Sequence, residues 1–420
     1  MRLSVLRLSS LAALCVIAVS AQAQTWSGGG GTNNFNNAAN WDTLPTNGSS
    51  ISFGLANGNL IAPKYTLNND FAALTLNAIN FNSDSSTYNY TLNGNAITMT
   101  AGSGNASIAN NSGTLQTINV NIASSVAATN PVQVNLNNGN LTIGGVISGT
   151  GGWQLNGPGT LTLNAANTYT GTTTVNSGVL LLNNANAVAS STVSVNSTNG
   201  LAFASGIGTF NVAGLGNGSG NIALSDTTGN QNVNLSVGGT NASSTFNGSL
   251  TNGAGSGVGS LTKVGTGTFT LSGTNSYTGI TTVSAGTLGF TTEQSFYNGN
   301  SASWTSANFV VASGATLALS TGGFTGSDIQ TISAQGTGSG GFLAGSTLGL
   351  DTTSGNFIDS NSIGNAGGNG LNISKLGANT LTLTGANTYT GTTTVNAGIL
   401  QFALRSSFYS ANMANWTANN

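Results

Sequence analysis

The chain has 420 residues but only 8 acidic and 6 basic side chains, no histidine and one cysteine, for a formal net charge of −2. Charged residues make up 3% of it, against roughly 25% in an ordinary soluble domain. This composition excludes imidazole bases and histidine metal ligands, and it argues against nucleic-acid binding, which needs clustered lysine and arginine. Because 38% of the residues are hydrophobic, the chain can still bury a core, and its abundant Gly, Asn, Thr and Ser are typical of short strands joined by tight turns.

Residues 1–23 have the features of a secretory signal peptide. Arg2 and Arg7 form a basic start, an apolar run follows from Leu8 to Val19, and Ala21-Gln22-Ala23 is a small-x-small cleavage site. The alternative interpretation is a short membrane anchor, for which this run is too short to span easily. We therefore expect cleavage before Gln24.

The one cysteine, Cys15, lies inside this predicted signal peptide. A lipoprotein signal is a further alternative, but it needs a small residue before the cysteine, and Leu14 stands there. The mature chain is therefore predicted to have no disulfide bond and no thiol chemistry.

Residues 24–54 form a Gly- and Asn-rich segment that contains Trp26, Phe35, Trp41 and Phe53. One interpretation is an aromatic platform for binding sugars. The other, which we favour, is an N-terminal cap, because the first unit of a stacked repeat protein exposes an apolar end that must be covered.

A long internal repeat dominates the rest of the sequence. LTLNAANTYTGTTTVNSGVL (residues 161–180) and LTLTGANTYTGTTTVNAGIL (residues 381–400) share sixteen of twenty letters, and the more diverged LSGTNSYTGITTVSAGTL lies at residues 271–288. The tyrosines of the three copies, Tyr169, Tyr277 and Tyr389, are almost evenly spaced. Their spacing gives a repeating unit of about 110 residues, which is long enough to hold several turns of a repetitive fold.

Each copy contains short alternating runs. In residues 160–163 (TLTL) Leu alternates with Thr, and this period of two predicts a strand with one apolar face and one hydroxyl face. Gly171 and Gly178 fall between such runs, where we expect turns that need positive φ. Strands recur about every 20 residues and no segment after Gln24 has useful helical periodicity, so we predict a parallel β-solenoid over residues 55–420.

Stacking explains the low charge. In a solenoid each rung lies about 4.8 Å above the last, and two like charges at that spacing repel by roughly 1 kcal/mol even in water. Stacked Asn, Thr and Ser side chains can instead form hydrogen-bonded ladders. We therefore expect columns of uncharged polar residues on the surface of the solenoid.

Carboxylates are the remaining candidates for catalysis. Asp226, Asp351 and Asp359 are the best of them, because paired acid–base chemistry needs two carboxyl groups within about 5–10 Å of each other. Their surroundings, LSDTTG and LDTTSGNFIDS, are typical of turns, and we interpret all three as turn residues. We therefore predict no catalytic residue.

Two motif matches are interpreted as coincidences. Ser260-Leu261-Thr262-Lys263 matches the S-x-x-K pattern of a serine nucleophile, but that motif works on a helix and this one lies in a strand-like run. Gly336-x-Gly338-x-x-Gly341 matches a dinucleotide-binding fingerprint, but no helix is expected after it. No acidic calcium-binding loop repeats, so we predict no cofactor-binding residue, no metal-binding residue and no cofactor.

Tyr169, Tyr277 and Tyr389 recur in register, each before a Thr-Gly pair. A ladder of ligand-binding rings is one interpretation. The interpretation that we favour is structural: the tyrosine packs over the edge of a rung and the glycine turns the corner.

The end of the sequence repeats an earlier segment. FYSANMANWTANN (residues 408–420) aligns without a gap to FYNGNSASWTSAN (residues 296–308), which is followed by the strand-like Phe309-Val310-Val311. The sequence stops where that strand would begin again, so we expect the chain to be a fragment of a longer protein.

The string GTLTLxGANTYTGxTTVNxGxL resembles the autotransporter-associated β-strand repeat, also called the passenger-associated transport repeat. The matching stretches are residues 159–182, 265–288 and 378–400. The resemblance implies a secreted or surface-displayed passenger, folded as a right-handed parallel β-helix, whose repeats aid secretion and folding across the outer membrane. Such passengers usually precede a β-barrel translocator, and similar repeats occur in proteins with a sorting tail, but residues 1–420 contain neither pattern.

We therefore predict an all-β, secreted or cell-surface protein, associated with the outer membrane, that has a structural or adhesive role and no enzymatic activity. Loops between repeats, such as residues 290–308 and 321–370, would make its contacts, with surface glycans or other cell-surface proteins as partners. Two alternatives stay open. One is a carbohydrate-active enzyme, which would need charged residues clustered in one groove, and the other is a polysaccharide-binding module built on residues 24–54.

Overall fold

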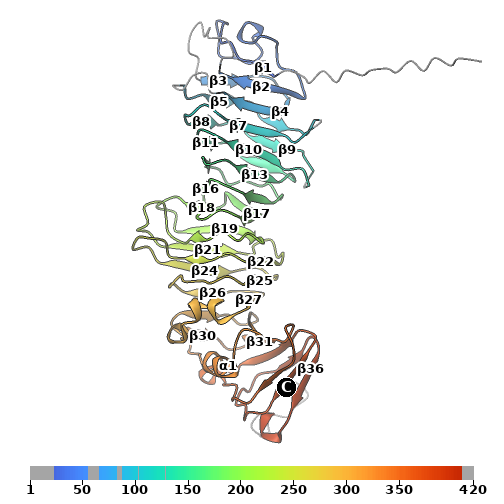
Figure 1. Ribbon diagram of the computed structural model, residues 1–420, viewed down its shortest axis with the longest axis vertical. Helices are drawn as coiled ribbons and strands as arrows, with labels where there is room; N and C mark the ends of the chain where they lie inside the picture. Colours follow the sequence, from blue (N-terminus) through green and yellow to red (C-terminus); the bar gives the residue numbers. More distant parts are fainter. Residues whose placement is uncertain (1–22, 55–65, 83–87, 103, 128, 409–420) are drawn as a thin grey trace, which may run out of the picture.

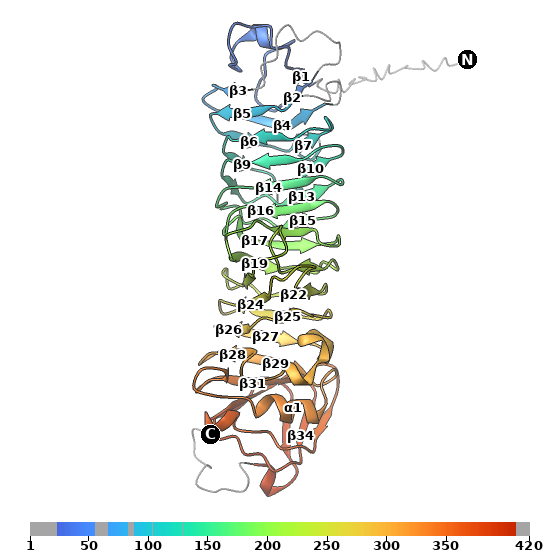
Figure 2. The same ribbon diagram turned by 90° about the vertical axis from the view of Figure 1, so that its left-hand side faces the viewer.

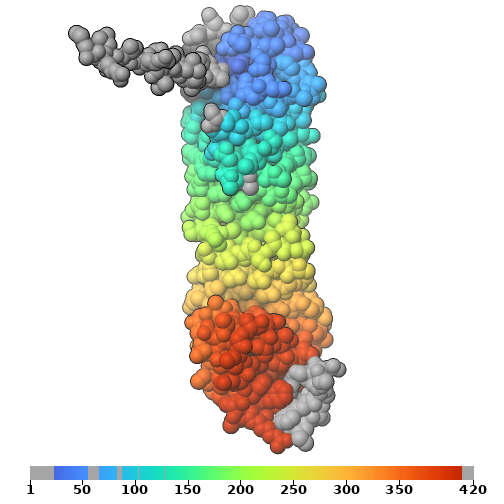
Figure 3. All heavy atoms as spheres, turned by 90° about the vertical axis from the view of Figure 1, so that its right-hand side faces the viewer, coloured from blue at the N-terminus to red at the C-terminus, as the bar shows by residue number. Residues whose placement is uncertain are grey.

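The computed structural model describes residues 23–54, 66–82, 88–102, 104–127 and 129–408, so the predicted signal peptide lies outside the described residues except for Ala23. The described residues form a rod of stacked rungs, with Gln24 near one end and the third repeat at the other (Figures 1 and 2). The space-filling view shows the same elongated shape (Figure 3). Strands of successive rungs pair in parallel, so the prediction of an all-β parallel β-helix is confirmed.

One wall of the rod is a single sheet of 17 strands, which we call the long sheet. It branches at β4, whose first half pairs with β6 and whose second half pairs with β7, so that β6, β9 and β12 form a short column beside the main one. Its strands are β1 (Gln24–Thr25), β2 (Ser49–Phe53), β4 (Leu74–Phe81), β6 (Ile97–Met99), β7 (Ser107–Asn110), β9 (Ile122–Ser124), β10 (Val132–Leu136), β12 (Ile147–Gly149), β13 (Trp153–Asn156), β15 (Thr173–Val175), β17 (Val188–Val195), β19 (Thr209–Leu215), β21 (Val233–Val237), β24 (Gly259–Lys263), β26 (Thr281–Val283), β28 (Phe309–Val311) and β30 (Gly341–Phe342).

The other strands belong to four smaller sheets. The early sheet contains β3 (Thr66–Asn69), β5 (Thr91–Gly94), β8 (Gln116–Ile118), β11 (Leu141–Ile143), β14 (Thr160–Leu163), β16 (Val179–Leu182) and β18 (Leu201–Phe203). The late sheet contains β22 (Ser244–Phe246), β25 (Thr268–Leu271), β27 (Thr287–Phe290), β29 (Thr316–Ser320), β31 (Thr347–Asp351), β33 (Asn372–Leu376) and β35 (Thr393–Val395). β20 (Ile222–Ala223) pairs with β23 (Leu250–Thr251), and the end sheet contains β32 (Phe357–Asp359), β34 (Thr380–Leu383) and β36 (Ile399–Phe402).

The strands are interrupted by a short α-helix that the sequence pattern did not indicate, α1 (Gly326–Ser333). Thr325 and Asp328 form a capping box at its start, and Ile329 and Ile332 are buried. A helix of eight residues shows only two apolar positions, too few for a periodic signal. No helix among the described residues is long and apolar enough to cross a membrane. The remaining helical turns are of the 3-10 type: η1 (Ala38–Asn40), η2 (Glu293–Ser295), η3 (Tyr297–Gly299), η4 (Ser301–Ser303), η5 (Ala366–Gly368) and η6 (Arg405–Ser407).

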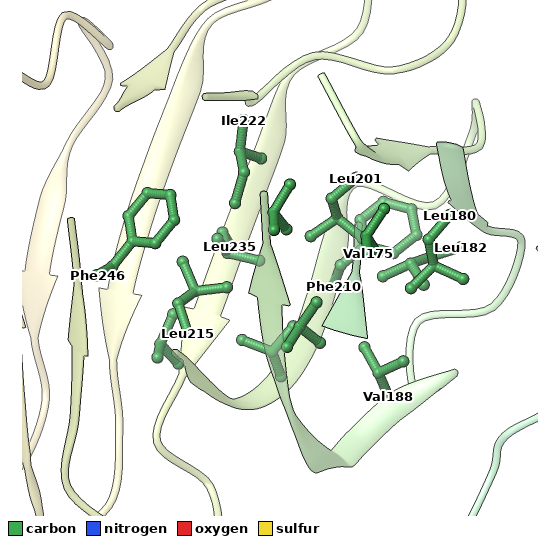
Figure 4. Close-up of a cluster of buried hydrophobic side chains, with 14 of the residues drawn as sticks. Val175, Leu180, Leu182, Val188, Leu201, Phe210, Leu215, Ile222, Leu235 and Phe246 are labelled. Carbon is green, nitrogen blue, oxygen red and sulfur yellow. The ribbon is translucent and has the colours of Figure 1, made fainter. Parts of the chain in front are cut away.

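The first repeat has short, regular rungs. Leu155 aligns with Val175, and Val175 aligns with Val195, so each turn of the coil has the predicted length there. Near the N-terminus Ile51 aligns with Ile79, so that rung is longer. Inward-pointing apolar side chains from both walls meet in the middle of the rod (Figure 4). Burying each of them contributes roughly 1.5–3 kcal/mol.

The polar ladders expected from stacking are present. The clearest runs along the long sheet, where Asn156 donates to Asn135 at 3.1 Å, Asn176 to Asn156 at 3.0 Å, and Asn196 to Asn176 at 3.0 Å. In each step a side-chain amide N–H donates to the side-chain oxygen of the rung before. An amide can continue such a column because it carries a donor and an acceptor, whereas a charged group would repel its neighbour.

The four N-terminal aromatic residues pack on one another. Trp26, Phe35, Trp41 and Phe53 are each at most 5% exposed, and all six pairs of rings have centroids 5.1–6.4 Å apart. Phe53 also stacks on Phe81 of β4 at 5.3 Å, which joins this cluster to the first rungs. Such burial leaves little ring surface on which a sugar could stack.

The third repeat is placed differently from the first two. In the first repeat β13 and β15 extend the long sheet, as β24 and β26 do in the second. Their equivalents in the third repeat, β33 and β35, continue the late sheet from β31, and β34 and β36 pair with β32 in the end sheet. The last strand of the long sheet among the described residues is β30. The strands of the third repeat therefore lie on different sheets from their counterparts in the first two repeats. Figure 1 shows them lying obliquely to the stack.

Candidate functional site

The centre of each repeat is a buried asparagine two residues before the tyrosine. Asn167 accepts the N–H of Ile147 at 2.8 Å through its side-chain oxygen and donates to the carbonyl oxygen of Ala187 at 2.9 Å. These partners lie one rung before it and one rung after it. One side chain therefore joins three consecutive rungs, and we call this arrangement the asparagine clamp.

The clamp is the same in all three copies. The second and third copies use Asn275 between the N–H of Leu250 (2.9 Å) and the carbonyl of Ser295 (2.7 Å), and Asn387 between the N–H of Ile363 (2.8 Å) and the carbonyl of Ser407 (2.6 Å). In each copy the backbone N–H of the residue after the asparagine also donates to the carbonyl oxygen of the apolar residue whose N–H the asparagine accepts. In the first copy this bond runs from Thr168 to Ile147. Both backbone groups of that apolar residue are thereby satisfied, and a buried backbone group without a partner would cost about 1–3 kcal/mol.

The repeat tyrosine is a buried structural residue. Tyr169 and Thr173 share a hydrogen bond of 2.6 Å, Tyr277 and Thr281 share one of 2.7 Å, and Thr393 donates to the hydroxyl of Tyr389 at 3.1 Å. The three tyrosines are at most 1% exposed. Burial raises the pKa of Tyr169 to about 12 and that of Tyr277 well above its usual value. The rings thus have the position that the structural interpretation expects.

The two repeat glycines serve different purposes. Gly178 has a φ of 74°, as its predicted turn requires. The same expectation for Gly171 is wrong, since its φ lies outside the left-handed region. Its role is close packing instead, because a Cβ atom there would overlap the backbone of Gly151 and Gly152 in the rung before.

A lysine fixes the first turn of the second and third copies. The ammonium group of Lys263 donates to the carbonyls of Val264 (2.7 Å), Gly265 (2.8 Å) and Ala285 (3.3 Å). Lys375 makes the same three contacts with Leu376, Gly377 and Ala397 at 2.7–3.0 Å. Desolvation lowers the pKa of both lysines. Sequence reasoning noticed Lys263 only inside a false motif and missed this structural role.

That motif does not form a nucleophilic site. Lys263 is buried, whereas Ser260 lies three positions earlier on the same strand, β24, and is partly exposed. Residues an odd number of positions apart on a strand point to opposite faces, so the pair cannot work together. The glycine fingerprint at 336–341 also fails, since α1 ends before it and Gly336 bridges to Gly341 in a tight loop.

Two of the three candidate aspartates hold their own turns. Asp226 accepts the hydroxyl of Thr228 at 2.7 Å and the N–H groups of Asn230 and Gln231 at 3.1 and 3.2 Å. Desolvation works to raise its pKa, but these hydrogen bonds outweigh it and hold the pKa below its usual value. The carboxyl group of Asp351 accepts the N–H of Thr353 at 2.9 Å.

Asp359 is the third candidate, and it is buried at 1% exposure. One carboxyl oxygen accepts the N–H of Asn361 at 2.9 Å, and burial raises the pKa of the group. No hydrogen bond within the described residues joins any two of the three aspartates, and each carboxyl group accepts hydrogen bonds only from residues up to five positions away. Their geometry agrees with the interpretation as turn residues.

Comparisons with known proteins match the repeats. A family model described as the passenger-associated-transport-repeat matches residues 154–182, 261–289 and 373–402, which contain the three stretches identified from the sequence. The adhesin BmaC autotransporter of Brucella suis biovar 1 (strain 1330) is 34% identical over 269 residues, covering 62% of this chain but only 7% of that relative. No solved structure matches. The resemblance to proteins with passenger-associated transport repeats is therefore confirmed.

Proposed function

We propose that this chain, which carries three passenger-associated-transport repeats, is a piece of a secreted or cell-surface autotransporter passenger with a structural and adhesive role. The family match supports the passenger assignment, and the name of the Brucella relative supports adhesion. Because the chain spans so little of that relative, its ligand and its attachment to the outer membrane are part of the proposal. We propose no enzymatic activity.

The asparagine clamp is the observation that carries this proposal. Its hydrogen bonds reach only 20 to 25 residues along the chain, from Leu250 to Asn275 in the longest case. A rung can therefore close as soon as the next one is available, without waiting for a distant segment. A stack in which each unit contacts only its neighbours can fold by propagation from one end. This suits a chain that folds while it is being secreted, and we propose that the repeats aid both steps.

The surface chemistry supports the structural half of the role. Asparagine ladders such as Asn135 to Asn196 run along the rod and need no salt-sensitive ion pairs. With no cysteine in the described residues, stability rests on backbone pairing, amide ladders and the apolar core. Such a rod suits a spacer that holds a binding surface away from the cell.

Surface display can be tested with antibodies raised against the chain and applied to intact and permeabilised cells of the organism that makes it. Labelling of intact cells, removed by external protease, is the expected result. Labelling that appears only after permeabilisation would overturn the proposal. Adhesion is tested separately by coating beads with the chain and counting those that bind to cell monolayers, with beads coated with albumin as the control.

The role of the repeats in secretion has its own test. Replacing Asn167, Asn275 and Asn387 together by alanine is expected to lower the amount of chain at the surface severalfold, since three rungs lose their closing contacts. The matched control replaces the exposed ladder residues Asn176 and Asn196 by alanine. Equal surface amounts in the two variants would count against a special role for the repeats.

A further inference from the structure

A hollow of about 450 Å³ lies in the insert that separates the second and third repeats. Three separate segments line it: Glu293 of η2, Phe324 and Thr325 just before α1, and Phe357, Ile358 and Asn361 at β32. Its volume falls within the roughly 300–1,000 Å³ range of small-molecule sites. We call it the insert hollow. It combines acidic, neutral polar and apolar side chains, unlike the surface hollow at Thr192 and Thr268, whose lining contains no charged or aromatic residue.

The Glu293 carboxyl group lines one side of the insert hollow, and Asp328 of α1 lies close to it but outside the lining. Desolvation, followed by the nearby carboxyl group of Asp328, raises the pKa of Glu293. Asp328 is fixed by the start of α1, where it accepts the N–H and the hydroxyl of Thr325 at 2.8 and 2.5 Å. Asp328 is therefore committed to the helix cap, and Glu293 is the carboxyl acceptor that faces the hollow.

An exposed apolar surface stands at another side. Ile358 is 69% exposed, more than any other large hydrophobic side chain among the described residues, and Phe357 beside it is half-buried. β32 is an edge strand of the end sheet, since it pairs only with β34. An isolated exposed isoleucine would need no explanation. Next to Glu293 and the polar residues that line the hollow, Ile358 supplies the apolar half of an amphipathic binding surface.

We propose that the insert hollow binds a neutral carbohydrate, with sugar hydroxyls on Glu293 and Asn361 and a sugar C–H face on Ile358 and Phe357. This inference rests on the adhesive role proposed above and assigns it a ligand class and a site. A sugar ring presents both kinds of surface, hydroxyls around its rim and C–H groups on its faces. A strongly basic peptide fits less well, because the rest of the lining, including Thr325 and Asn361, is uncharged. The lining contains no base for an anionic polysaccharide.

Affinity electrophoresis of the chain through gels that contain dextran, galactomannan or laminarin tests the proposal, with alginate and oligolysine as charged comparators. We expect at least one neutral polysaccharide to retard the chain. Glu293→Gln and Ile358→Thr should each weaken that retardation about tenfold or more, as loss of a hydrogen bond to a charged group of about 1.5–3 kcal/mol implies for the first. Circular dichroism checks that both variants fold.

Matched controls lie elsewhere on the rod. Ile280→Thr alters another exposed isoleucine and introduces the residue found in the other two copies, and Asp351→Asn removes a carboxylate outside the hollow. Both controls should bind like the unaltered chain. Retardation by alginate or oligolysine alone, no retardation by any neutral polysaccharide, or unchanged binding of both hollow variants would overturn the proposal. If beads coated with Ile358→Thr still adhere to cells as the unaltered chain does, the adhesive role stands and the assignment of its site fails.

Discussion

The second and third repeats share the same central motif but extend different sheets. In the second, β24 and β26 lie on the long sheet; in the third, their counterparts β33 and β35 lie on the late sheet. The internal contacts survive this change, because Asn275 and Asn387 make the same clamp and Lys263 and Lys375 hold the same three carbonyls. The repeat therefore specifies its own rung. The wall on which that rung is placed depends on what precedes it.

The insert between the two repeats explains the change of wall. After β29 the chain forms α1, β30, β31 and β32 before the third repeat begins, whereas no helix precedes the second repeat among the described residues except the short turn η1 near the N-terminus. In the late sheet β31 pairs with β29, and β33 pairs in turn with β31. Four sets of substitutions probe the local contacts of the repeats and of the insert, and the largest effect is expected at the clamp.

Asn275→Ala removes the clamp of the second repeat. Two buried backbone groups, the N–H of Leu250 and the carbonyl of Ser295, lose their partner, and at about 1–3 kcal/mol for each group the local stability should fall by about 2–6 kcal/mol. Amide hydrogen exchange in β23 to β27 measures this, since a rod of repeats does not unfold as one unit. Asn387→Ala should have a similar local effect, and Asn176→Ala, in an exposed ladder, a small one. A loss confined to one of the two clamp variants would show that placement controls the clamp.

Lys263→Leu gives the second repeat the residue that the first repeat has at this position, Leu155. Three carbonyl groups lose the ammonium donor, but their residues are partly exposed, so water can replace some of the lost hydrogen bonds. We therefore expect the free energy of unfolding to fall by about 1–3 kcal/mol. Amide hydrogen exchange in β24 to β26 measures it. Lys375→Leu is the companion variant. If neither variant loses stability, the three carbonyls are satisfied by water and the lysine is dispensable.

The sequence predicted the regular parts of this molecule well and the insert poorly. Alternation in residues 160–163 indicated β14, and the short spacing of successive strands indicated the coil, because both patterns depend on neighbours within one rung. α1 was missed although Thr325 and Asp328 form a capping box, since the apolar run that normally follows this signature is too short. The change of wall had no signal in the sequence, because it depends on how segments far apart pack.

The candidate site shows the same division. The Asn-Thr/Ser-Tyr-Thr-Gly motif marked the clamp by its recurrence, but the hydrogen bonds of Asn167 could not be predicted without knowing which backbone groups lie in the adjacent rungs. The false expectation for Gly171 has the same origin, since its need for glycine comes from the backbone of the previous rung. Glu293 and Asp328 belong to unrelated segments that are distant in the chain, so their proximity was not visible either.

Val283→Ala and Val395→Ala compare the two repeats at equivalent positions. Val283 is fully buried, and its truncation should cost about 2 kcal/mol, from roughly 0.8 kcal/mol for each lost methylene equivalent plus a cavity. Val395 is 49% exposed, because no described strand pairs with the far edge of β35, and its truncation should cost less than about 0.5 kcal/mol. Denaturation midpoints of both variants measure the difference. Equal losses would show that Val395 is covered in solution, for example by self-association.

Asp359→Asn is expected to have the smallest effect, and its sign is diagnostic. Burial raises the pKa of this carboxyl in the folded chain, so the folded state binds its proton more tightly than the unfolded state. That contribution to stability is fully present below the unfolded pKa and is lost as the pH rises through the folded pKa. The asparagine variant should therefore be more stable than the unaltered chain at pH 7, with a difference that shrinks on acidification. Exchange of the α1 amides at pH 4 and pH 7 reports it.

Asp226→Asn supplies the control of opposite sign for this last prediction. Hydrogen bonds from Thr228 and two backbone N–H groups outweigh desolvation and hold the pKa of Asp226 below the usual value. Its contribution to stability is therefore present above the unfolded pKa and is lost as the pH falls through the folded pKa. The variant should be less stable than the unaltered chain at pH 7 and approach it on acidification. If both variants shift stability in the same direction, the two carboxyl environments do not differ as the structure indicates.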